Sequence, residues 1–115
     1  MATRRNQRIN QDFIKELSLL IPLLKDPRID AFISVMQVDV TNDLSYAKIY
    51  IGSINGYDKA KEACEVLKKA SGHLRSQLAN RMHIRKIPEL LFYPDDSAEY
   101  ALRIDSIIEG FNKDE

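Results

Sequence analysis

Apolar residues near the N-terminus recur at intervals of three and four positions. The series is Ile9, Phe13, Leu17, Leu20, Ile21 and Leu24. This spacing places apolar side chains on one face of an α-helix, so it predicts a helix over residues 9–24. Pro22 is expected to kink or fray the last turn, because proline lacks the N–H that a helix interior uses. The Asp26-Pro27 step then stops the helix, since a residue before proline avoids helical geometry.

The next two apolar stretches, residues 33–40 and 46–51, predict an antiparallel hairpin with turn-forming residues between them. Alternate positions of the second stretch form two sets, Ala47, Ile49, Ile51 and Tyr46, Lys48, Tyr50. The alternation in the first stretch changes phase near Met36, which predicts a β-bulge there. The face with the two tyrosines could stack nucleobases, but we favour packing of these rings against the first helix.

Helical spacing returns after the Asn55-Gly56 turn. A stripe of small and apolar residues predicts a helix over residues 58–70 that packs closely on a sheet, with Asp58 as its N-cap. A second stripe predicts a helix over residues 73–83. The two stripes are Ala60, Ala63, Leu67, Ala70 and Leu74, Leu78, Met82.

A short strand is predicted over residues 89–93, between two prolines, and a last helix over residues 97–112. Asp96 and Glu99 are spaced as in a capping box for that helix. The resulting order is α-β-β-α-α-β with an extra C-terminal helix. We therefore expect an α+β fold, with three strands in one layer and helices on one of its faces. The 115 residues fit one domain, with residues 1–5 as a flexible N-terminus.

The chain carries 17 basic and 17 acidic residues, but they are unevenly distributed. Residues 66–88 contain no acidic residue, whereas residues 89–115 are strongly acidic. The basic residues of the first segment are Lys68, Lys69, Arg75, Arg81, Arg85 and Lys86. A solvated helix face normally mixes charges of both signs, so this segment predicts contact with RNA or another polyanion. Arg4, Arg5 and Arg8 are expected to add secondary contacts.

The Ala70-Ser71-Gly72 junction between the two central helices has two interpretations, between which the spacing does not decide. In the first, a glycine ends one helix and Ser71 begins the next. In the second, the junction exposes backbone N–H groups to a phosphate, supported by nearby Lys68, Lys69, His73 and Arg75. Gly72 is expected to hold a positive φ, so a valine there should destabilise the protein by about 1–3 kcal/mol. Ser71 is a possible cap contributing about 1 kcal/mol.

No residue set predicts catalysis, a metal site or a cofactor. His73 and His83 lack the cysteines or acids that would complete a metal site. Cys64 is expected to pack in the interior, and as the only cysteine it forms no intramolecular disulfide, which fits a reducing compartment. Asp95-Asp96 suits helix capping better than acid–base chemistry. No apolar run approaches the length of a membrane span, so we expect a cytoplasmic protein that contacts no membrane. Because no catalytic residue set is present, we also expect that it is not an enzyme.

Several segments together resemble the ribosome-binding factor A family. They are residues 25–29, the hairpin over 38–51, the junction over 67–75, Arg81, Arg85, the strand over 88–92 and Asp96-Ser97. The resemblance implies a KH-like domain of the type II order, with Ala70-Ser71-Gly72 where KH domains usually carry a GXXG loop. It also implies binding to the immature small ribosomal subunit and its 16S rRNA, support of late 16S 5′-end maturation, and a role in growth in the cold.

These observations define an expected interface and its partners. The expected RNA contacts are Lys68, Lys69, Ser71, Gly72, His73, Arg75, Arg81, Arg85 and Lys86, with Arg4, Arg5 and Arg8. The expected partners are 16S rRNA and free small subunits, without DNA, and the protein is expected to be a monomer. The alternative is a protein-interaction module whose acidic C-terminal face binds a basic ribosomal protein.

Overall fold

The computed structural model describes residues 4–95. It contains helix α1 (Arg4–Leu20), the 3-10 turn η1 (Ile21–Leu24), strands β1 (Ile33–Val40) and β2 (Tyr46–Ser53), helices α2 (Tyr57–Lys69) and α3 (Ser71–Arg81), and strand β3 (Glu89–Pro94). This order agrees with the predicted α-β-β-α-α-β succession. Helix α1 begins at Arg4, within the stretch 1–5 that was predicted as flexible, and residues 1–3 lie outside the described residues. The predicted C-terminal helix over residues 97–112, with its capping box, lies outside the described residues.

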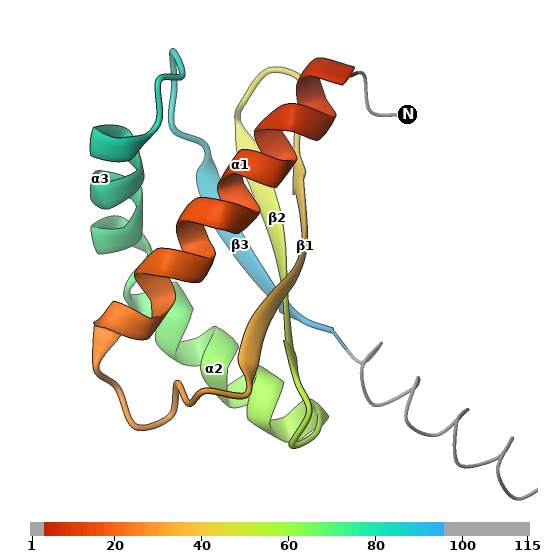
Figure 1. The fold of residues 1–115 in the computed structure, drawn as a ribbon, viewed down its shortest axis with the longest axis vertical. Helices are drawn as coiled ribbons and strands as arrows, with labels where there is room; N and C mark the ends of the chain where they lie inside the picture. Colours follow the sequence, from red (N-terminus) through yellow and green to blue (C-terminus); the bar gives the residue numbers. More distant parts are fainter. Residues whose placement is uncertain (1–3, 96–115) are drawn as a thin grey trace, which may run out of the picture.

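The three strands form one sheet in the order β1-β2-β3 (Figure 1). β1 and β2 are antiparallel, and β2 and β3 are parallel. The register of the hairpin shifts between Val35 and Gln37, which confirms the bulge predicted at Met36. The parallel pair requires a long crossover, and α2 with α3 provides it.

Helices cover one face of the sheet. Ala47, Ile49 and Ile51 are fully buried on that face, where α1 packs mainly on β1 and α2 on β2 and β3. Tyr46 is 45% exposed on the opposite face, and Tyr50 contacts Tyr93 with ring centroids 5.7 Å apart. The interpretation that these tyrosines pack against the first helix is therefore wrong, because alternate strand residues point to opposite faces and the helices lie on the other one.

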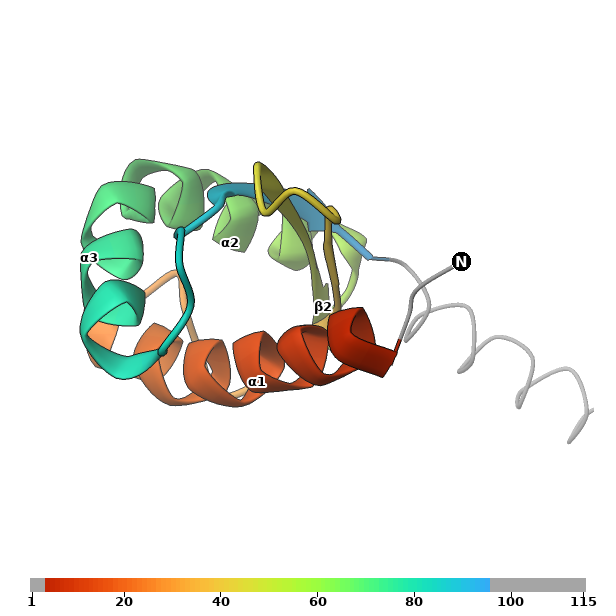
Figure 2. The ribbon, with the colours of Figure 1, turned by 90° about the horizontal axis from the view of Figure 1, so that it is seen from above.

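The predicted apolar face of the first helix is confirmed, and Pro22 acts as expected. Phe13 and Leu17 are fully buried. The α-helix ends at Leu20, and the chain continues as one 3-10 turn with Pro22 at its start, ending at Lys25 in left-handed geometry (φ 53°). Figure 2 shows α3 at the opposite end of the molecule from β2, with α1 running between them. The core fills the space that these elements enclose.

The junction between α2 and α3 is tighter than predicted. A single residue, Ala70, ends α2 and precedes α3, with φ −91° and ψ 3°. Ser71 is the first residue of α3 and therefore not its cap, and Gly72 has no positive φ. A Cβ added to Gly72 would meet no atom within 4 Å. The strain and crowding expected of Gly72→Val are thus absent from the structure.

The start of α2 also differs from its prediction. The helix begins at Tyr57, and its N-cap is Gly56, at φ 115°, rather than Asp58. Asp58 lies inside the first turn, where its charge still favours the positive end of the helix dipole. The positive φ that was predicted for Gly72 occurs instead at Gly56. Gly56 lies in the turn before α2, whereas Gly72 lies within α3, where a helical residue has a negative φ.

The two glycines give opposite predictions for alanine substitution. Gly72→Ala should raise the free energy of unfolding by about 0.5–1 kcal/mol, because alanine reduces the entropy of the unfolded chain and suits a helix. Gly56→Ala should lower it by about 1 kcal/mol or more, because alanine resists a φ of 115°. Urea denaturation measures both changes, and a destabilised Gly72→Ala variant would contradict the geometry of the junction.

Candidate nucleic-acid interface

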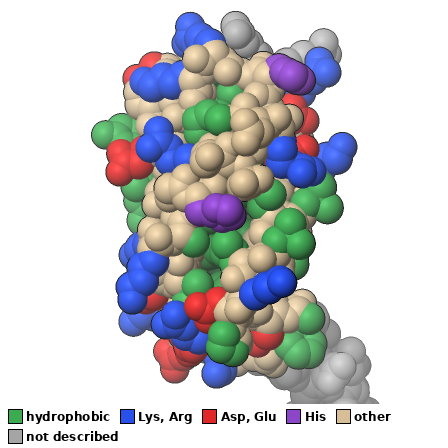
Figure 3. All heavy atoms as spheres, turned by 90° about the vertical axis from the view of Figure 1, so that its left-hand side faces the viewer, with side chains coloured by type: hydrophobic (Ala, Val, Ile, Leu, Met, Phe, Trp, Pro, Cys, Tyr) green, Lys and Arg blue, Asp and Glu red, His purple; other side chains and the backbone are tan. Residues whose placement is uncertain are grey.

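The basic residues of segment 66–88 do not form one patch. Lys68 lines a hollow beside β3, together with Ser71 and Tyr93. Lys69 lines a different hollow beside Asp26 and Arg28. Consecutive residues on a helix point about 100° apart, so neighbours in sequence reach different surfaces. Figure 3 shows Lys and Arg side chains distributed along the edges of the face on the α3 side, with acidic side chains among them.

The hollow beside Lys69 carries a mixed charge. Arg28 donates to the Asp26 carboxylate at 2.9 Å, and these hydrogen bonds, with the ion pair, hold the pKa of Asp26 below its ordinary value. Arg28 is already occupied by this carboxylate. Among the described residues, Lys69 is then the one cation that lines this hollow without an ion pair, because Lys68 lines another hollow. The positive potential at this hollow is therefore weaker than the sequence pair Lys68-Lys69 suggests.

Two of the expected RNA contacts are engaged within the protein. The Nη2 atom of Arg75 donates to the carbonyl oxygen of Ile87 at 3.1 Å. The Nε atom of Arg81 donates to the carboxylate of Glu16 on α1, and the two side chains form an ion pair. Both arginines remain exposed. These contacts connect α3 to the segment before β3 and to α1, so both arginines also stabilise the packing of α3.

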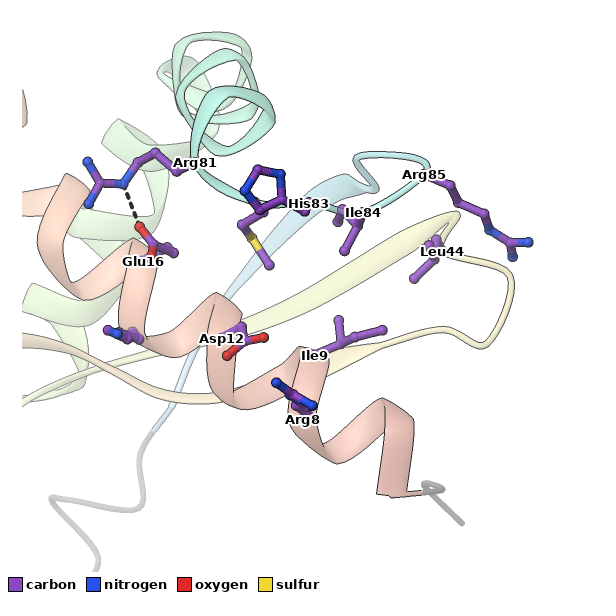
Figure 4. Close-up of a pocket in the computed structure, with 11 residues that line it drawn as sticks. Arg8, Ile9, Asp12, Glu16, Leu44, Arg81, His83, Ile84 and Arg85 are labelled. Atoms are coloured by element: carbon purple, nitrogen blue, oxygen red, sulfur yellow. Dashed lines mark hydrogen bonds and ion pairs between the residues drawn. The ribbon is translucent and has the colours of Figure 1, made fainter.

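A cleft of about 500 Å³ lies where α1, the β1–β2 turn and the segment after α3 meet; we call it the α1–α3 cleft. Figure 4 shows its lining. The lining residues are Arg8, Ile9, Asp12, Lys15, Glu16, Leu44, Arg81, Met82, His83, Ile84 and Arg85. A cleft of this volume falls within the range of ordinary ligand sites. It unites residues from two basic segments that are far apart in the sequence, Arg8 from the first and Arg81 and Arg85 from the second.

The floor of the cleft is apolar. Leu44 and Met82 are buried in it, and Ile9 and Ile84 are partly buried. In Figure 4, Ile9, Leu44 and Ile84 approach the same space from α1, the β1–β2 turn and the segment after α3. None of these apolar residues was predicted as part of a binding site. Ile9 and Met82 belong to predicted helix faces, Leu44 belongs to the predicted turn, and Ile84 lies between predicted elements.

The β1–β2 turn holds Leu44 in an unusual conformation. Leu44 has φ 60°, a left-handed geometry that is strained for a bulky side chain such as leucine. Its N–H donates to the carbonyl of Thr41 at 3.0 Å. The Asp43 carboxylate accepts from the N–H of Ser45 at 3.0 Å and from the Thr41 hydroxyl at 2.9 Å. Hydrogen bonds from Ser45, and then from Thr41, lower the pKa of Asp43 to about 2.

The lowered pKa of Asp43 predicts how stability depends on pH. The folded-state pKa is about 2 and the ordinary value is 3.8, so the charged carboxylate stabilises the fold above about pH 4. That contribution is lost as the pH falls from about 4 to about 2. Asp43→Asn should therefore be less stable than the original protein at neutral pH and should lose less stability over this acidic window.

Urea denaturation at a series of acidic pH values measures this effect. Asp39→Asn is a matched control, since Asp39 is exposed on β1 and does not contribute to the turn. If Asp43→Asn and Asp39→Asn showed the same pH profile, the hydrogen bonds of the turn would not stabilise the carboxylate as described.

The rim of the cleft is basic. Arg8, Lys15 and Arg85 carry exposed charges, and Arg81 is neutralised by Glu16. Lys86, one residue beyond the rim, contributes to the lowered pKa of Asp43 and so lies near the β1–β2 turn. Arg8 was predicted as a secondary contact, but it lines the same cleft as Arg85. The side chains of Arg4 and Arg5 lie outside the described part of the chain.

Two further charged residues of the cleft, Asp12 and Lys15, were not predicted as part of the site. Arg8, Asp12 and Lys15 follow one another at helical spacing. They therefore form a charged stripe on α1 beside the apolar face that contains Ile9 and Phe13. This spacing is the one sequence signal that could have indicated a charged edge there. Nothing in the sequence could show that the stripe faces the segment after α3.

Other chemistry finds little support in residues 4–95. No group of three or more histidine, cysteine or acidic side chains is placed to hold a metal ion within this range. None of the helices described is both long and apolar enough to span a membrane. Cys64 is buried, and desolvation raises the pKa of its thiol to about 11. Its predicted role in packing is confirmed.

Comparison with known proteins identifies close relatives. The family model described as ribosome-binding factor A matches residues 5–108. The ribosome-binding factor A of Clostridium tetani is 45% identical over 117 residues, covering 100% of this chain and 96% of the relative. The protein of the same name from Caldanaerobacter subterraneus is 37% identical, covering 96% and 92% of the two chains.

Solved structures agree with the fold. The crystal structure of ribosome-binding factor A from Thermus thermophilus has a TM-score of 0.69 at 26% identity, covering 77% of this chain and 94% of that one. A solution structure of a putative ribosome-binding factor A from Thermotoga maritima has a TM-score of 0.71 at 26% identity, covering 81% and 89%. A homology model of the Thermus thermophilus protein, fitted into a cryo-EM map of a 30S complex, has a TM-score of 0.63 at 26% identity, covering 76% and 91%.

Proposed function

The chain belongs to the ribosome-binding factor A family, and on this premise we propose that it binds the small ribosomal subunit by contacting 16S rRNA at the α1–α3 cleft. A related protein has been fitted into a map of a 30S complex. The observation that carries the proposal is that Arg8, from α1, and Arg85, from the segment after α3, both line this cleft. Cations placed in this way release counterions from RNA phosphates on binding.

The proposed contacts have different roles. Arg8, Lys15, Arg85 and Lys86 surround the cleft and bind phosphates. Arg81 positions the cleft by holding Glu16 on α1. The remaining expected contacts among the described side chains do not line the cleft, and they bind RNA that extends beyond it. They are Lys68, Lys69, Ser71, Gly72, His73 and Arg75.

We further propose that the protein acts as a non-catalytic assembly factor in the cytoplasm. It binds immature small subunits as a monomer, supports late maturation of the 16S 5′ end, and matters most in the cold. Support comes from the family and from the basic rim and apolar floor of the α1–α3 cleft, which suit RNA binding. Such a site holds an RNA conformation while other enzymes cut the RNA.

Loss of the protein should delay small-subunit maturation. A deletion strain is expected to accumulate precursor 16S rRNA and free subunits, with the largest effect at low temperature, and the protein should co-sediment with free small subunits but not with polysomes. Sucrose gradients and primer extension of the 16S 5′ end measure both. Normal precursor levels in the cold would contradict the assembly role, and cleavage of precursor RNA by the pure protein would contradict the absence of catalysis.

A further inference from the structure

The α1–α3 cleft combines a charged rim with an apolar floor. Phosphates interact with Arg8, Lys15 and Arg85 at the rim, but they gain nothing from Ile9, Leu44 and Ile84 beneath. Apolar surface that stays in contact with water costs free energy, and a flat, weakly polar group that covers it removes this cost. A site for phosphate alone does not need such a floor, whereas a site for a nucleobase does.

One carboxylate also argues against a site for phosphate alone. Asp12 is exposed at the mouth of the cleft. Within residues 7–95 its carboxylate forms no ion pair, whereas that of Glu16 is paired with Arg81. Figure 4 places Asp12 between Glu16 and Ile9 along α1, at the edge of the cleft. A free carboxylate repels a phosphate, but it accepts a hydrogen bond from the amino group of cytosine or adenine.

We propose that the α1–α3 cleft binds one unpaired RNA base that carries an exocyclic amino group, cytosine or adenine. Asp12 accepts a hydrogen bond from the amino group, while Ile9, Leu44 and Ile84 contact the ring. This inference rests on the proposed function, because 16S rRNA supplies the base. Bases in a duplex are stacked and paired, and proteins that read RNA sequence therefore bind unpaired bases in loops, bulges and ends.

The rim completes the site by holding the backbone on either side of the base. Arg8 lies on α1, and Arg85 lies across the cleft on the segment after α3. Figure 4 shows the Arg85 side chain extending away from the cleft, where it can reach a phosphate next to the bound nucleotide. The cations thus supply most of the affinity, and the floor with Asp12 supplies the selectivity.

Three RNA probes of equal length and charge test the proposal: oligocytidylate, oligouridylate, and an oligomer with abasic residues. Fluorescence anisotropy with the full chain at fixed salt gives the dissociation constants. Oligocytidylate should bind on the order of tenfold more tightly than the abasic oligomer, because a base buries its ring. It should bind about fivefold more tightly than oligouridylate, which lacks the amino group. Equal affinity for all three, or binding of none, would overturn the proposal.

Variants of the protein locate the effect. Asp12→Ala should abolish the preference for cytidine over uridine and should raise the affinity for the abasic oligomer, because a charge that repels phosphate is removed. Glu65→Ala, at an exposed position of α2, removes the same charge away from the cleft and should change the preference little. An Asp12→Ala protein that keeps the full preference would assign base recognition elsewhere.

The apolar floor is tested separately. Ile84→Ser should weaken binding of cytidine and uridine oligomers alike and leave binding of the abasic oligomer unchanged. Ile29→Ser is the matched control, because Ile29 is partly buried against the same core and does not line the cleft. An equal loss in both variants would show that the effect comes from stability and would contradict ring contact at Ile84.

Co-sedimentation with small subunits, measured in parallel, separates this inference from the proposed function. Co-sedimentation without a base preference would support the proposed function and contradict the base site. Absence of co-sedimentation would contradict the proposed function, whatever the affinities for the oligomers.

Discussion

Replacing Arg8 and Arg85 by glutamine is expected to weaken binding to the small subunit by roughly tenfold at low salt, since each exposed ion pair contributes up to about 1 kcal/mol. The slope of log affinity against log salt should become shallower by about 1.4–1.8, because two phosphate contacts and their released counterions are lost. Both arginines are exposed, so the free energy of unfolding should change by less than about 0.5 kcal/mol.

The matched control for this variant is the double substitution Lys48→Gln and Lys61→Gln. Both lysines are exposed, on β2 and α2, and neither lines the cleft. The control changes the net charge by the same amount, so it separates contact at the cleft from a general loss of positive charge. Filter binding over a salt series measures both variants. Identical salt slopes for the two double variants would show that RNA affinity depends on the net charge of the protein and not on contacts at the cleft.

Leu44→Ala is expected to destabilise the protein by about 2–5 kcal/mol, the range for a buried leucine reduced to alanine. Leu44 is 6% exposed and belongs to the core cluster. The loss is a large share of the roughly 5–15 kcal/mol that stabilises a typical domain. It should also lower affinity for the small subunit even where the variant is fully folded, because Leu44 forms part of the cleft floor. Denaturant titration and subunit binding below the unfolding transition measure the two effects.

Comparison with Leu44→Gly tests the left-handed geometry of the turn. Alanine at φ 60° retains a strain of about 1–2 kcal/mol that glycine does not have. The glycine variant should therefore equal or exceed the alanine variant in stability. At Leu78, fully buried within α3, the order should be the reverse, with glycine less stable than alanine by about 1 kcal/mol. The same order at both sites would show that the turn imposes no strain on Leu44.

Local patterns in the sequence predicted most of the fold correctly. The apolar spacing before Pro22, the change of phase at Met36 and the small-residue stripe before Ala70 each gave an element that the structure contains. Errors occurred where two local solutions were equally compatible with the sequence. A glycine beside a helix junction suggested a positive φ at Gly72, but Ala70 alone forms the bend.

The candidate site was predictable only in its charge. The run of basic residues without acids predicted a charged surface on α3 and the segment after it, and Arg81 and Arg85 of that run line the cleft. It could not show that Arg81 is paired with Glu16, or that Lys68 and Lys69 face different hollows. Such pairings depend on which elements lie next to each other, and that depends on packing rather than on the local sequence.

The local sequence was sufficient to predict the periodic features of this protein, namely its helices and strands and the apolar face of α1. These follow from spacings of two and about 3.6 residues, and neighbouring positions alone define them. The sharing of one cleft by Arg8, Leu44 and Arg85 depends instead on the tertiary structure. These residues are far apart in the chain, and they meet because α1 and the segment after α3 pack at the same end of the sheet as the β1–β2 turn.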